Sequence, residues 1–314
     1  MGKARVTCSI GKKDHMSKFT ISGVARPGGA GDLAGRPVSR VGYGAMQLAR
    51  LRGDRTAAVA LVRRAVELGV DHIDTAHFYG DGFVNGILRE ALHPGDGVLV
   101  ASKVGADPGP HEPYPSSAQR PEQLRSSVED NLASLGLEQI PVVNLRRNDV
   151  GFAAFGSEDQ QVDLEDQLAE MIALREEGKI GAIGLSSVTL DGLRRALPAG
   201  ITCVQNPYSL LARDDEPLLS LCREEGVAWV PYFPLGSAVP GLPKVVDLPA
   251  VVEVAAELDA TPAQVGLAWL LHHSPNTLLI PGTSDTSHLE ANVAAGSVIL
   301  DAASIALLET ASID

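Results

Sequence analysis

Residues 69–80 read GVDHIDTAHFYG and place a carboxylate, Asp74, and a phenol, Tyr79, after a short apolar run. A second run, VLVAS at 98–102, continues into Lys103. Short runs of this kind, bounded by glycine and rich in valine and isoleucine, are typical of buried parallel strands. If these two runs are neighbouring strands, the acid, the phenol and the amine meet at the carboxyl edge of one sheet.

Strand-like runs alternate with amphipathic stretches along most of the chain. Eight strand–helix repeats imply parallel strands with right-handed crossovers, and eight is the number that closes a barrel. We therefore expect an α/β fold of the (β/α)8 TIM-barrel class, with a doubly wound sheet as the alternative. The predicted strands are Arg40–Ala45, Val70–Asp74, Val98–Ser102, Pro141–Leu145, Ile180–Ser186, Ile201–Gln205, Val227–Tyr232 and Thr277–Pro281.

The predicted helices carry apolar stripes and end signals. Thr261 opens the stretch Thr-Pro-Ala-Gln, a capping box with proline at the first helical position. Glycines at 69, 178 and 226 precede predicted strands, as helix C-caps do. The glycine-rich stretch 27–35 predicts a loop, and Gly29-Ala30-Gly31 within it predicts a turn rather than a dinucleotide-binding loop. Two of the stripes are Ala58, Leu61, Val62, Ala65 and Leu164, Leu168, Met171, Ile172.

Composition excludes several classes of protein. The 314 residues are 45% hydrophobic and 21% charged, which favours a globular chain over a disordered one. With Lys+Arg 26 against Asp+Glu 39, the net charge of −13 argues against a nucleic-acid partner. No run approaches the roughly 20 apolar residues of a membrane span. Cys8, Cys203 and Cys222 are too few and too far apart for a disulfide framework, which favours the cytoplasm.

No linker or low-complexity tract divides the chain, so we expect one barrel domain over residues 17–314. Residues 1–16, MGKARVTCSIGKKDHM, are locally basic and lack the apolar stretch of a signal peptide. We expect this segment to be disordered or derived from an expression vector.

Asp74, Tyr79 and Lys103 together suit the protonation of a carbonyl oxygen. A tyrosine has an unperturbed pKa of about 10 and is a poor acid at neutral pH. A nearby ammonium lowers that pKa, and a carboxylate beside the lysine keeps the lysine charged and in place. A structural ion pair beside a half-buried tyrosine is the alternative interpretation.

These motifs resemble the aldo-keto reductase superfamily. GVDHIDTAHFYG and VLVASKVG are followed in the family's order by GKIGAIGLSS at 178–187, VQNPYSLL at 204–211, PYFPLG at 231–236 and IPGTSDTSHLEAN at 280–292. The resemblance runs from about Arg40 to Asn292 and so covers nearly the whole predicted barrel. It implies reduction of a small-molecule aldehyde or ketone with NADPH.

The resemblance also implies roles for the matching residues. Tyr79 would be the general acid, Lys103 would tune its pKa, and Asp74 would pair with Lys103. The nicotinamide carboxamide would be held by Ser186, Ser187 and Gln205, with Tyr232 stacked on the ring. The pyrophosphate would lie against Leu235, Gly236 and Ser237, and the adenosine end against Gly282, Thr283, Ser284, His288 and Asn292.

The chain departs from the family at the fourth catalytic position. The family has a histidine in a Leu-His-Arg-x-Asp stretch, whereas this chain reads LRRND at 145–149 and places Arg146 at the histidine position. A guanidinium can donate to a carbonyl oxygen and more strongly to a developing alkoxide, so Arg146 is the expected fourth catalytic residue. Its permanent charge would either select anionic or phenolate-bearing substrates or hold Tyr79 in a different state. VNLR and FPLG are similar to bacterial members that include pyridoxal reductases, which suggests pyridoxal as the substrate.

The cofactor positions depart as well, since Gly282 and His288 stand where many members carry Lys and Arg for the 2′-phosphate. NADPH remains the expected cofactor, with modest discrimination against NADH and with no metal. A non-catalytic NADP(H)-binding regulatory barrel is the alternative, favoured by Arg146 and opposed by the intact Asp74, Tyr79 and Lys103. A metal-dependent isomerase or lyase is a third and more distant interpretation, because the strand ends lack a cluster of metal ligands.

The other histidines and cysteines are expected to be mainly structural. His72 and Cys203 are predicted to be buried in the core. His272 and His273 are predicted to stabilise a helix end, and His77 is equally compatible with a substrate contact and a plain loop position. Specificity is expected to come from the loops Asp107–Gln119 and Val150–Val162 and from the stretch after Ser237.

Overall fold

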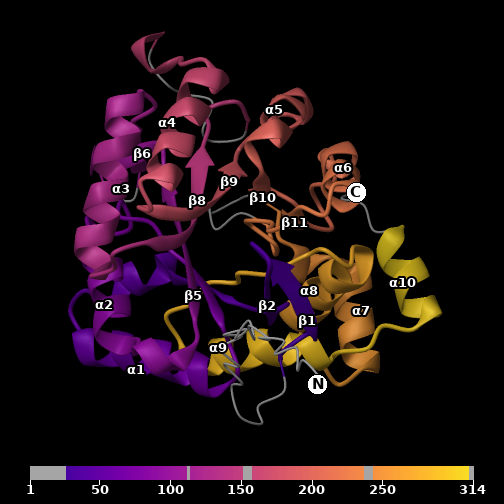
Figure 1. Ribbon diagram of the computed structural model, residues 1–314. Coiled ribbons are helices and arrows are strands. Elements are labelled where there is room, and N and C mark those ends of the chain that lie inside the picture. Colours follow the sequence, from indigo (N-terminus) through magenta and orange to yellow (C-terminus); the bar gives the residue numbers. More distant parts are fainter. Residues whose placement is uncertain (1–25, 112–113, 151–157, 237–242, 311–314) are drawn as a thin grey trace, which may run out of the picture.

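A computed structural model describes residues 26–111, 114–150, 158–236 and 243–310 of the chain. Its centre is a seven-stranded parallel sheet in the order β11-β10-β9-β8-β5-β4-β3. Helices lie around the outside of this sheet (Figure 1). The strands are β3 (Tyr43–Gly44), β4 (His72–Asp74), β5 (Leu99–Val104), β8 (Ile140–Arg146), β9 (Ile180–Ser186), β10 (Ile201–Gln205) and β11 (Ala228–Trp229).

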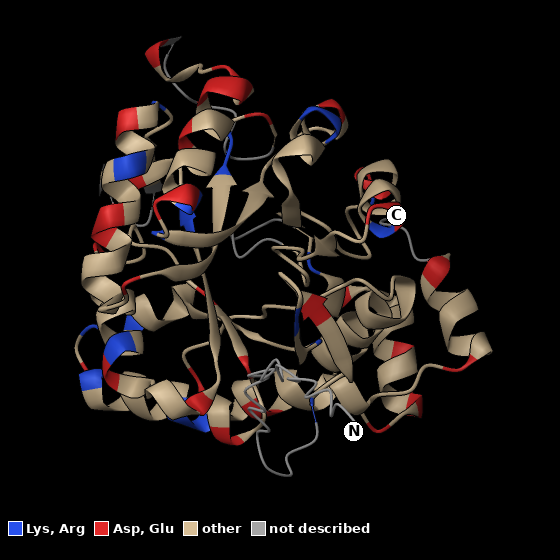
Figure 2. Cartoon of the chain, in the orientation of Figure 1, with Lys and Arg blue, Asp and Glu red and all other residues tan. Residues whose placement is uncertain are grey.

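The helices bury the stripes that their sequences carry. In α1 the buried residues are the four of the first predicted stripe, and Thr261 caps α8 by accepting from the Gln264 backbone N–H. Charged residues gather on these helices around the sheet (Figure 2). The helices are α1 (Arg55–Glu67), α2 (Phe83–Ala91), α3 (Pro121–Leu135), α4 (Leu164–Glu176), α5 (Leu190–Ala196), α6 (Glu216–Glu224), α7 (Pro249–Glu257), α8 (Pro262–His273), α9 (Thr286–Ala294) and α10 (Ala302–Glu309).

Seven of the eight predicted strands belong to the sheet, and the eighth run contacts both of its edges. Thr277 makes a parallel bridge to Trp229 of β11, and Leu279 makes a parallel bridge to Val41, just before β3. Backbone hydrogen bonds support both contacts, including one of 2.8 Å from Leu278 N to Trp229 O and one of 2.8 Å from Gly42 N to Leu279 O. The run 277–281 therefore lies between the two edge strands.

The two faces of the sheet have different packing, as the period-two pattern of a strand requires. One face packs against the helices and contributes residues such as Val143, Ile183 and Val204 to the large core. The other face encloses a small core built from Leu99, Ala101, Val142, Ala182, Cys203, Ala228, Val230 and Leu278. Asp74, Lys103 and Arg146 follow this inner face to its carboxyl edge.

A β-hairpin covers the inner core and corrects the predicted loop over 27–35. Strands β1 (Ala30–Leu33) and β2 (Arg36–Ser39) pair antiparallel, and Leu33 and Val38 pack on the inner core. The turn lies at Ala34 and Gly35, both with positive φ, rather than at the predicted Gly29-Ala30-Gly31. A second hairpin, β6 (Ala106–His111) with β7 (Tyr114–Ser117), begins one residue before the expected specificity loop 107–119 and otherwise lies within it.

No single helix in the described ranges is long and apolar enough to cross a membrane. The segment Thr286–Ser297 and helix α10 meet the length and composition requirements only as a pair, with a bend of 115° between them.

The inner face leaves little room beside Gly184, and this makes a test of the packing. A Cβ at this position would lie 2.1 Å from Asn144 Oδ1 and 2.5 Å from Cys203 Sγ. Gly184→Ala should therefore lower the free energy of unfolding by about 1–3 kcal/mol in urea titrations. Gly53→Ala is the matched control, since nothing lies within 4 Å of a Cβ there. Equal stability of the two variants would contradict this packing.

Candidate active site

A buried ion pair joins the ends of β4 and β5. Lys103 Nζ donates to Asp74 Oδ1, and the two side chains are 8% and 4% exposed. Gln205 of β10 donates to the other carboxylate oxygen at 2.7 Å, and Lys103 also donates to Thr75 O at 3.3 Å. Burial by itself lowers the pKa of Lys103, but Asp74 and Tyr79 outweigh it and the net pKa is raised. Lys103 therefore remains charged in the neutral range.

Tyr79 lies over this pair, in the loop after β4. Lys103 Nζ is 5.1 Å from the centroid of the Tyr79 ring, and the Phe78 ring meets the Tyr79 ring edge to face at 5.0 Å. Burial raises the pKa of Tyr79, whereas Lys103 and Arg146 lower it, and burial prevails. The contribution of Lys103 has the expected sign, but the expected net lowering of the pKa is wrong. Tyr79 therefore holds its proton.

Arg146 ends β8 on the same inner face, in register with Ser186. Its side chain is half-buried, and burial lowers its pKa while Tyr232 and Tyr79 raise it. The Arg146 carbonyl accepts from Gln119 Nε2 at 2.8 Å, and the same nitrogen donates to Gly105 O at 2.6 Å. Gln119 therefore ties the end of β8 to the end of β5.

The residues expected to bind the nicotinamide lie together beside the ion pair. They are Ser186, Ser187, Gln205 and Tyr232. Ser187 has a left-handed backbone, with a φ of 56°, and its hydroxyl lies 3.1 Å from the Tyr232 hydroxyl. Its N–H donates to Gln205 O at 2.9 Å. Gln205 Oε1 is buried and has no hydrogen-bond partner among the described residues. A non-glycine residue at positive φ is strained, and such strain gathers at functional sites.

Asn206 holds this group in place and was missed by the sequence analysis. Its side chain accepts from Val188 N at 3.1 Å and donates to Val188 O at 2.8 Å, while its own carbonyl accepts from Tyr232 N at 3.1 Å. It thereby joins the chain after β9 to the chain after β11. The one feature of the sequence that could have pointed to Asn206 is its position next to Gln205.

A second network of hydrogen bonds, also not predicted, joins the ends of β4 and β5 to helices α2 and α3. Asn85 of α2 accepts from the Thr75 hydroxyl at 2.8 Å and donates to Asn131 of α3 at 2.9 Å. Asn131 in turn accepts from Ser102 at 2.6 Å. These buried amides fix the chain beside Asp74 and Lys103 to two helices.

The residues expected at the pyrophosphate and adenosine end lie on later segments. Gly236 has a φ of 90° and follows Leu235, which packs on the large core. Thr283 O accepts from the buried Tyr43 hydroxyl at 2.7 Å. Ser237 lies outside the described residues, as do positions 112–113, 151–157 and 238–242 of the expected specificity loops. Gly282 and Ser284 flank Thr283, exposed His288 lies in the first turn of α9, and Asn292 lies further along α9.

The structure shows the burial and the contacts of the other histidines and of Cys203. His72 is 2% exposed, and burial raises the pKa of the Cys203 thiol to about 12, so that this thiol stays protonated. His273 lies 2.9 Å from the Tyr208 hydroxyl and 3.0 Å from a carboxylate oxygen of Glu216, so it binds side chains rather than only ending α8. His77 is half-buried after β4. In the described ranges no three His, Cys, Asp or Glu residues could share a metal ion.

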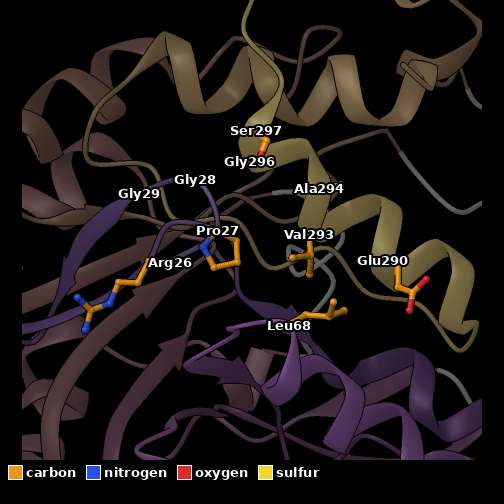
Figure 3. A pocket seen from close by; sticks show the side chains of 10 residues that line it. All are labelled: Arg26, Pro27, Gly28, Gly29, Leu68, Glu290, Val293, Ala294, Gly296 and Ser297. Carbon is orange, nitrogen blue, oxygen red and sulfur yellow. The ribbon is translucent and has the colours of Figure 1, made fainter. Parts of the chain in front are cut away.

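A cavity of about 290 Å³ has a lining of its own, whose side chains are shown in Figure 3. Its lining comes from 26–29, Leu68 just after α1, and the segment from Glu290 to Ser297. None of the residues expected to act in catalysis or cofactor binding lines it. The candidate active site is therefore the carboxyl edge of the sheet and not this cavity.

Comparison with known proteins assigns the family. Residues 40–313 match the Aldo/keto reductase family. The chain belongs to the aldo/keto reductase family. Pyridoxine 4-dehydrogenase of Escherichia coli is 42% identical over 270 residues, covering 84% of this chain and 91% of that protein. An uncharacterized oxidoreductase of Schizosaccharomyces pombe is 35% identical over 308 residues, covering 94% of each chain. This aldo/keto reductase is accordingly an oxidoreductase.

Solved structures agree with the fold. A thermostable aldo-keto reductase crystallised with the inhibitor epalrestat superposes with a TM-score of 0.75 at 26% identity, covering 90% of this chain and 98% of that one. A Klebsiella pneumoniae aldo/keto reductase in complex with NADP and acetate gives 0.74 at 22% identity, covering 91% and 95%.

The Asp74–Lys103 pair makes a test of the site's energetics. Lys103→Met leaves a buried carboxylate without its cation and should cost about 3–5 kcal/mol of unfolding free energy. The double variant Asp74→Asn/Lys103→Met removes both charges and should recover a large part of that loss. Urea titrations of the two variants and the parent at one pH measure the difference. A double variant as unstable as the single one would show that the two charges are not coupled.

Proposed function

We propose that this aldo/keto reductase reduces an aldehyde or ketone to the alcohol with NADPH, at the carboxyl edge of its parallel sheet. The observation that carries the proposal is the meeting of Asp74, Lys103 and Tyr79 at this edge, with Arg146 at the end of the neighbouring strand β8. A charged lysine next to a protonated phenol suits protonation of a carbonyl oxygen.

We propose further that the fold carrying this site is a single (β/α)8 barrel over residues 17–314. The bridges of the run 277–281 to Trp229 and Val41 support an eighth strand position between the sheet's edges. The inner core and the hairpin that packs on it support an enclosed interior. The family match over 40–313 supports one domain.

The residues at the strand ends fit a nicotinamide carboxamide. Such a group has an NH2 donor and an oxygen acceptor, and Gln205 Oε1 is a buried acceptor without a partner among the described residues. Ser186 and Ser187 offer hydroxyl donors next to it, and Tyr232 offers a ring. The NADP-bound structure of the Klebsiella pneumoniae protein supports NADPH as the cofactor. We expect modest discrimination against NADH, because positions 282 and 288 carry Gly and His instead of the Lys and Arg that would bind the 2′-phosphate of NADPH.

In the proposed mechanism, each residue has a separate task. When bound against Ser186, Ser187, Gln205 and Tyr232, the nicotinamide of NADPH would supply the hydride for the carbonyl carbon. Tyr79 gives its proton to the carbonyl oxygen, and Lys103 stabilises the phenolate that remains. Asp74 holds Lys103, and Gln205 holds Asp74. Arg146 donates to the carbonyl oxygen as negative charge develops there, which stabilises the transition state more than the neutral substrate.

Pyridoxal is the proposed substrate. The relative named pyridoxine 4-dehydrogenase is 42% identical to this chain over most of both proteins, which supports a vitamin B6 alcohol or aldehyde. Reduction of pyridoxal adds a hydride to its aldehyde carbon and a proton to the oxygen. NADPH oxidation with pyridoxal, compared with simple aldehydes, tests the assignment. Turnover on simple aldehydes alone would keep the reductase and remove this substrate.

Removing the Tyr79 hydroxyl tests the proton donor. Tyr79→Phe should lower kcat by at least about 100-fold, because a general acid contributes roughly 10²–10⁴-fold. NADPH binding, measured by fluorescence titration, should change little. Tyr208→Phe is the control, since it removes a tyrosine hydroxyl that contacts Glu216 and His273 instead. Parental kcat in Tyr79→Phe would overturn the assignment. NADPH binding without turnover in the parent protein would favour a regulatory barrel.

Chelation tests the metal-free mechanism. In the proposed mechanism Tyr79 supplies the proton, and Lys103 and Arg146 stabilise the negative charge that develops. No metal ion is needed, so EDTA should leave kcat unchanged. Dialysed protein assayed with and without EDTA gives the comparison. A loss of activity that added zinc or magnesium restores would contradict the mechanism.

A further inference from the structure

The charge of Arg146 lacks a counter-charge among the described residues. The Asp74 carboxylate is taken by Lys103 and Gln205. The neighbouring Arg147, by contrast, is paired with Asp149 at 3.0 Å. No carboxylate in the described ranges lies within ion-pair distance of Arg146, and the groups whose charge acts on it are the hydroxyls of Tyr79 and Tyr232. Among the described residues, Asp74, Lys103 and Arg146 therefore leave one positive charge in excess at this edge of the sheet.

The surroundings of Arg146 keep this charge in place. Its backbone carbonyl is held by the buried Gln119, and its side chain is half-buried. An arginine does not lose its proton in a protein, so the charge persists at every working pH. A half-buried cation without a counter-charge gains free energy when an anion binds.

We propose that Arg146 is the residue that selects the substrate, by binding an anionic oxygen that lies next to the carbonyl being reduced. This inference rests on the proposed reductase function and narrows its substrate class. A guanidinium presents parallel N–H donors that meet two oxygens in one plane. One donor serves the carbonyl oxygen and the other serves the anion. Ortho-hydroxy aldehydes as phenolates and 2-oxo acids as carboxylates both present such a pair of oxygens.

The position of Arg146 fits a substrate whose carbonyl oxygen and anionic oxygen lie close to each other. Arg146 ends β8, and the neighbouring strand β5 carries Lys103, whose Nζ lies 5.1 Å from the centroid of the Tyr79 ring. Arg146 therefore lies at the same edge of the sheet as the carbonyl oxygen that Tyr79 would protonate. An anion many bonds away from the carbonyl would not reach the same guanidinium. An arginine that only stabilises the alkoxide would instead favour neutral and anionic substrates equally.

Matched substrate pairs separate these two roles. Ortho-hydroxybenzaldehyde is compared with ortho-methoxybenzaldehyde, and phenylglyoxylate with its methyl ester, by NADPH oxidation with the full chain. The parent protein should prefer the anionic member of at least one pair in kcat/KM. In Arg146→Gln that preference should fall by roughly ten- to a hundredfold, as expected for a charge-assisted hydrogen bond. Arg146→Lys should retain part of it.

Two controls separate recognition from folding and from net charge. Arg120→Gln changes the net charge equally at an exposed ion pair with Glu122 and should leave the preference intact. The kcat/KM for ortho-hydroxybenzaldehyde should also grow as the pH rises through the pKa of that substrate, whereas the kcat/KM for ortho-methoxybenzaldehyde should show no such rise.

Each outcome decides the proposal. A preference for phenolate, carboxylate or both that disappears in Arg146→Gln supports it and identifies the anion. Equal slowing of all four substrates in Arg146→Gln overturns it and leaves the reductase intact.

If no carbonyl is reduced at all, the proposed function fails, and the binding of ortho-hydroxybenzoate then decides. Calorimetry with NADP⁺ present should show binding to the parent and at least about tenfold weaker binding to Arg146→Gln. Equal binding to the two, or none to the parent, overturns the inference.

Discussion

The buried ion pair between Asp74 and Lys103 constrains the rest of the structure. Taking two charges out of water costs several kcal/mol for each ion, and the cost is offset only when the charged atoms have well-placed partners. One of those partners, Gln205, belongs to β10, which three strands separate from β4 in the sheet. A hydrogen bond across that span requires the sheet to curl until side chains from distant strands meet on its concave face.

The inner face has the residues that such a curled sheet can hold. Gly184 leaves no space for a side chain beside Asn144 and Cys203, and the positions around it are small. A Cβ at Gly105 would lie 2.2 Å from Arg146 O, so the ends of β5 and β8 approach closely. The β1–β2 hairpin then covers the inner core at its other end, through Leu33 and Val38. The tight packing beside Gly184 and the meeting of side chains from distant strands at one edge are both consequences of this curvature.

Local patterns predicted most of the sheet and missed what depends on tertiary contact. Apolar runs and helix-ending glycines predicted eight strands, and seven of them belong to the sheet. Most of the β1–β2 hairpin was taken for a loop, because its buried apolar side chains, Leu33 and Val38, pack on the distant inner core. The site shows the same division. Motifs identified Asp74, Tyr79 and Lys103, but Gln119 and Asn206 act on backbone atoms of segments far along the chain, and no spacing reveals that. Residues 1–16 and Ser237 lie outside the described residues.

The direction of the Tyr79 pKa shows how the site's charges divide their work in the proposed mechanism. The sequence argument considered the ammonium and expected a lowered pKa, but burial outweighs it and the phenol keeps its proton. Before reaction a proton donor needs that proton, and burial supplies the condition. After proton transfer the site must hold a phenolate, and Lys103 and Arg146 both favour that anion. A histidine at the position of Arg146 would change its charge near neutral pH, whereas a guanidinium does not. Arginine there makes the stabilisation of developing negative charge independent of pH.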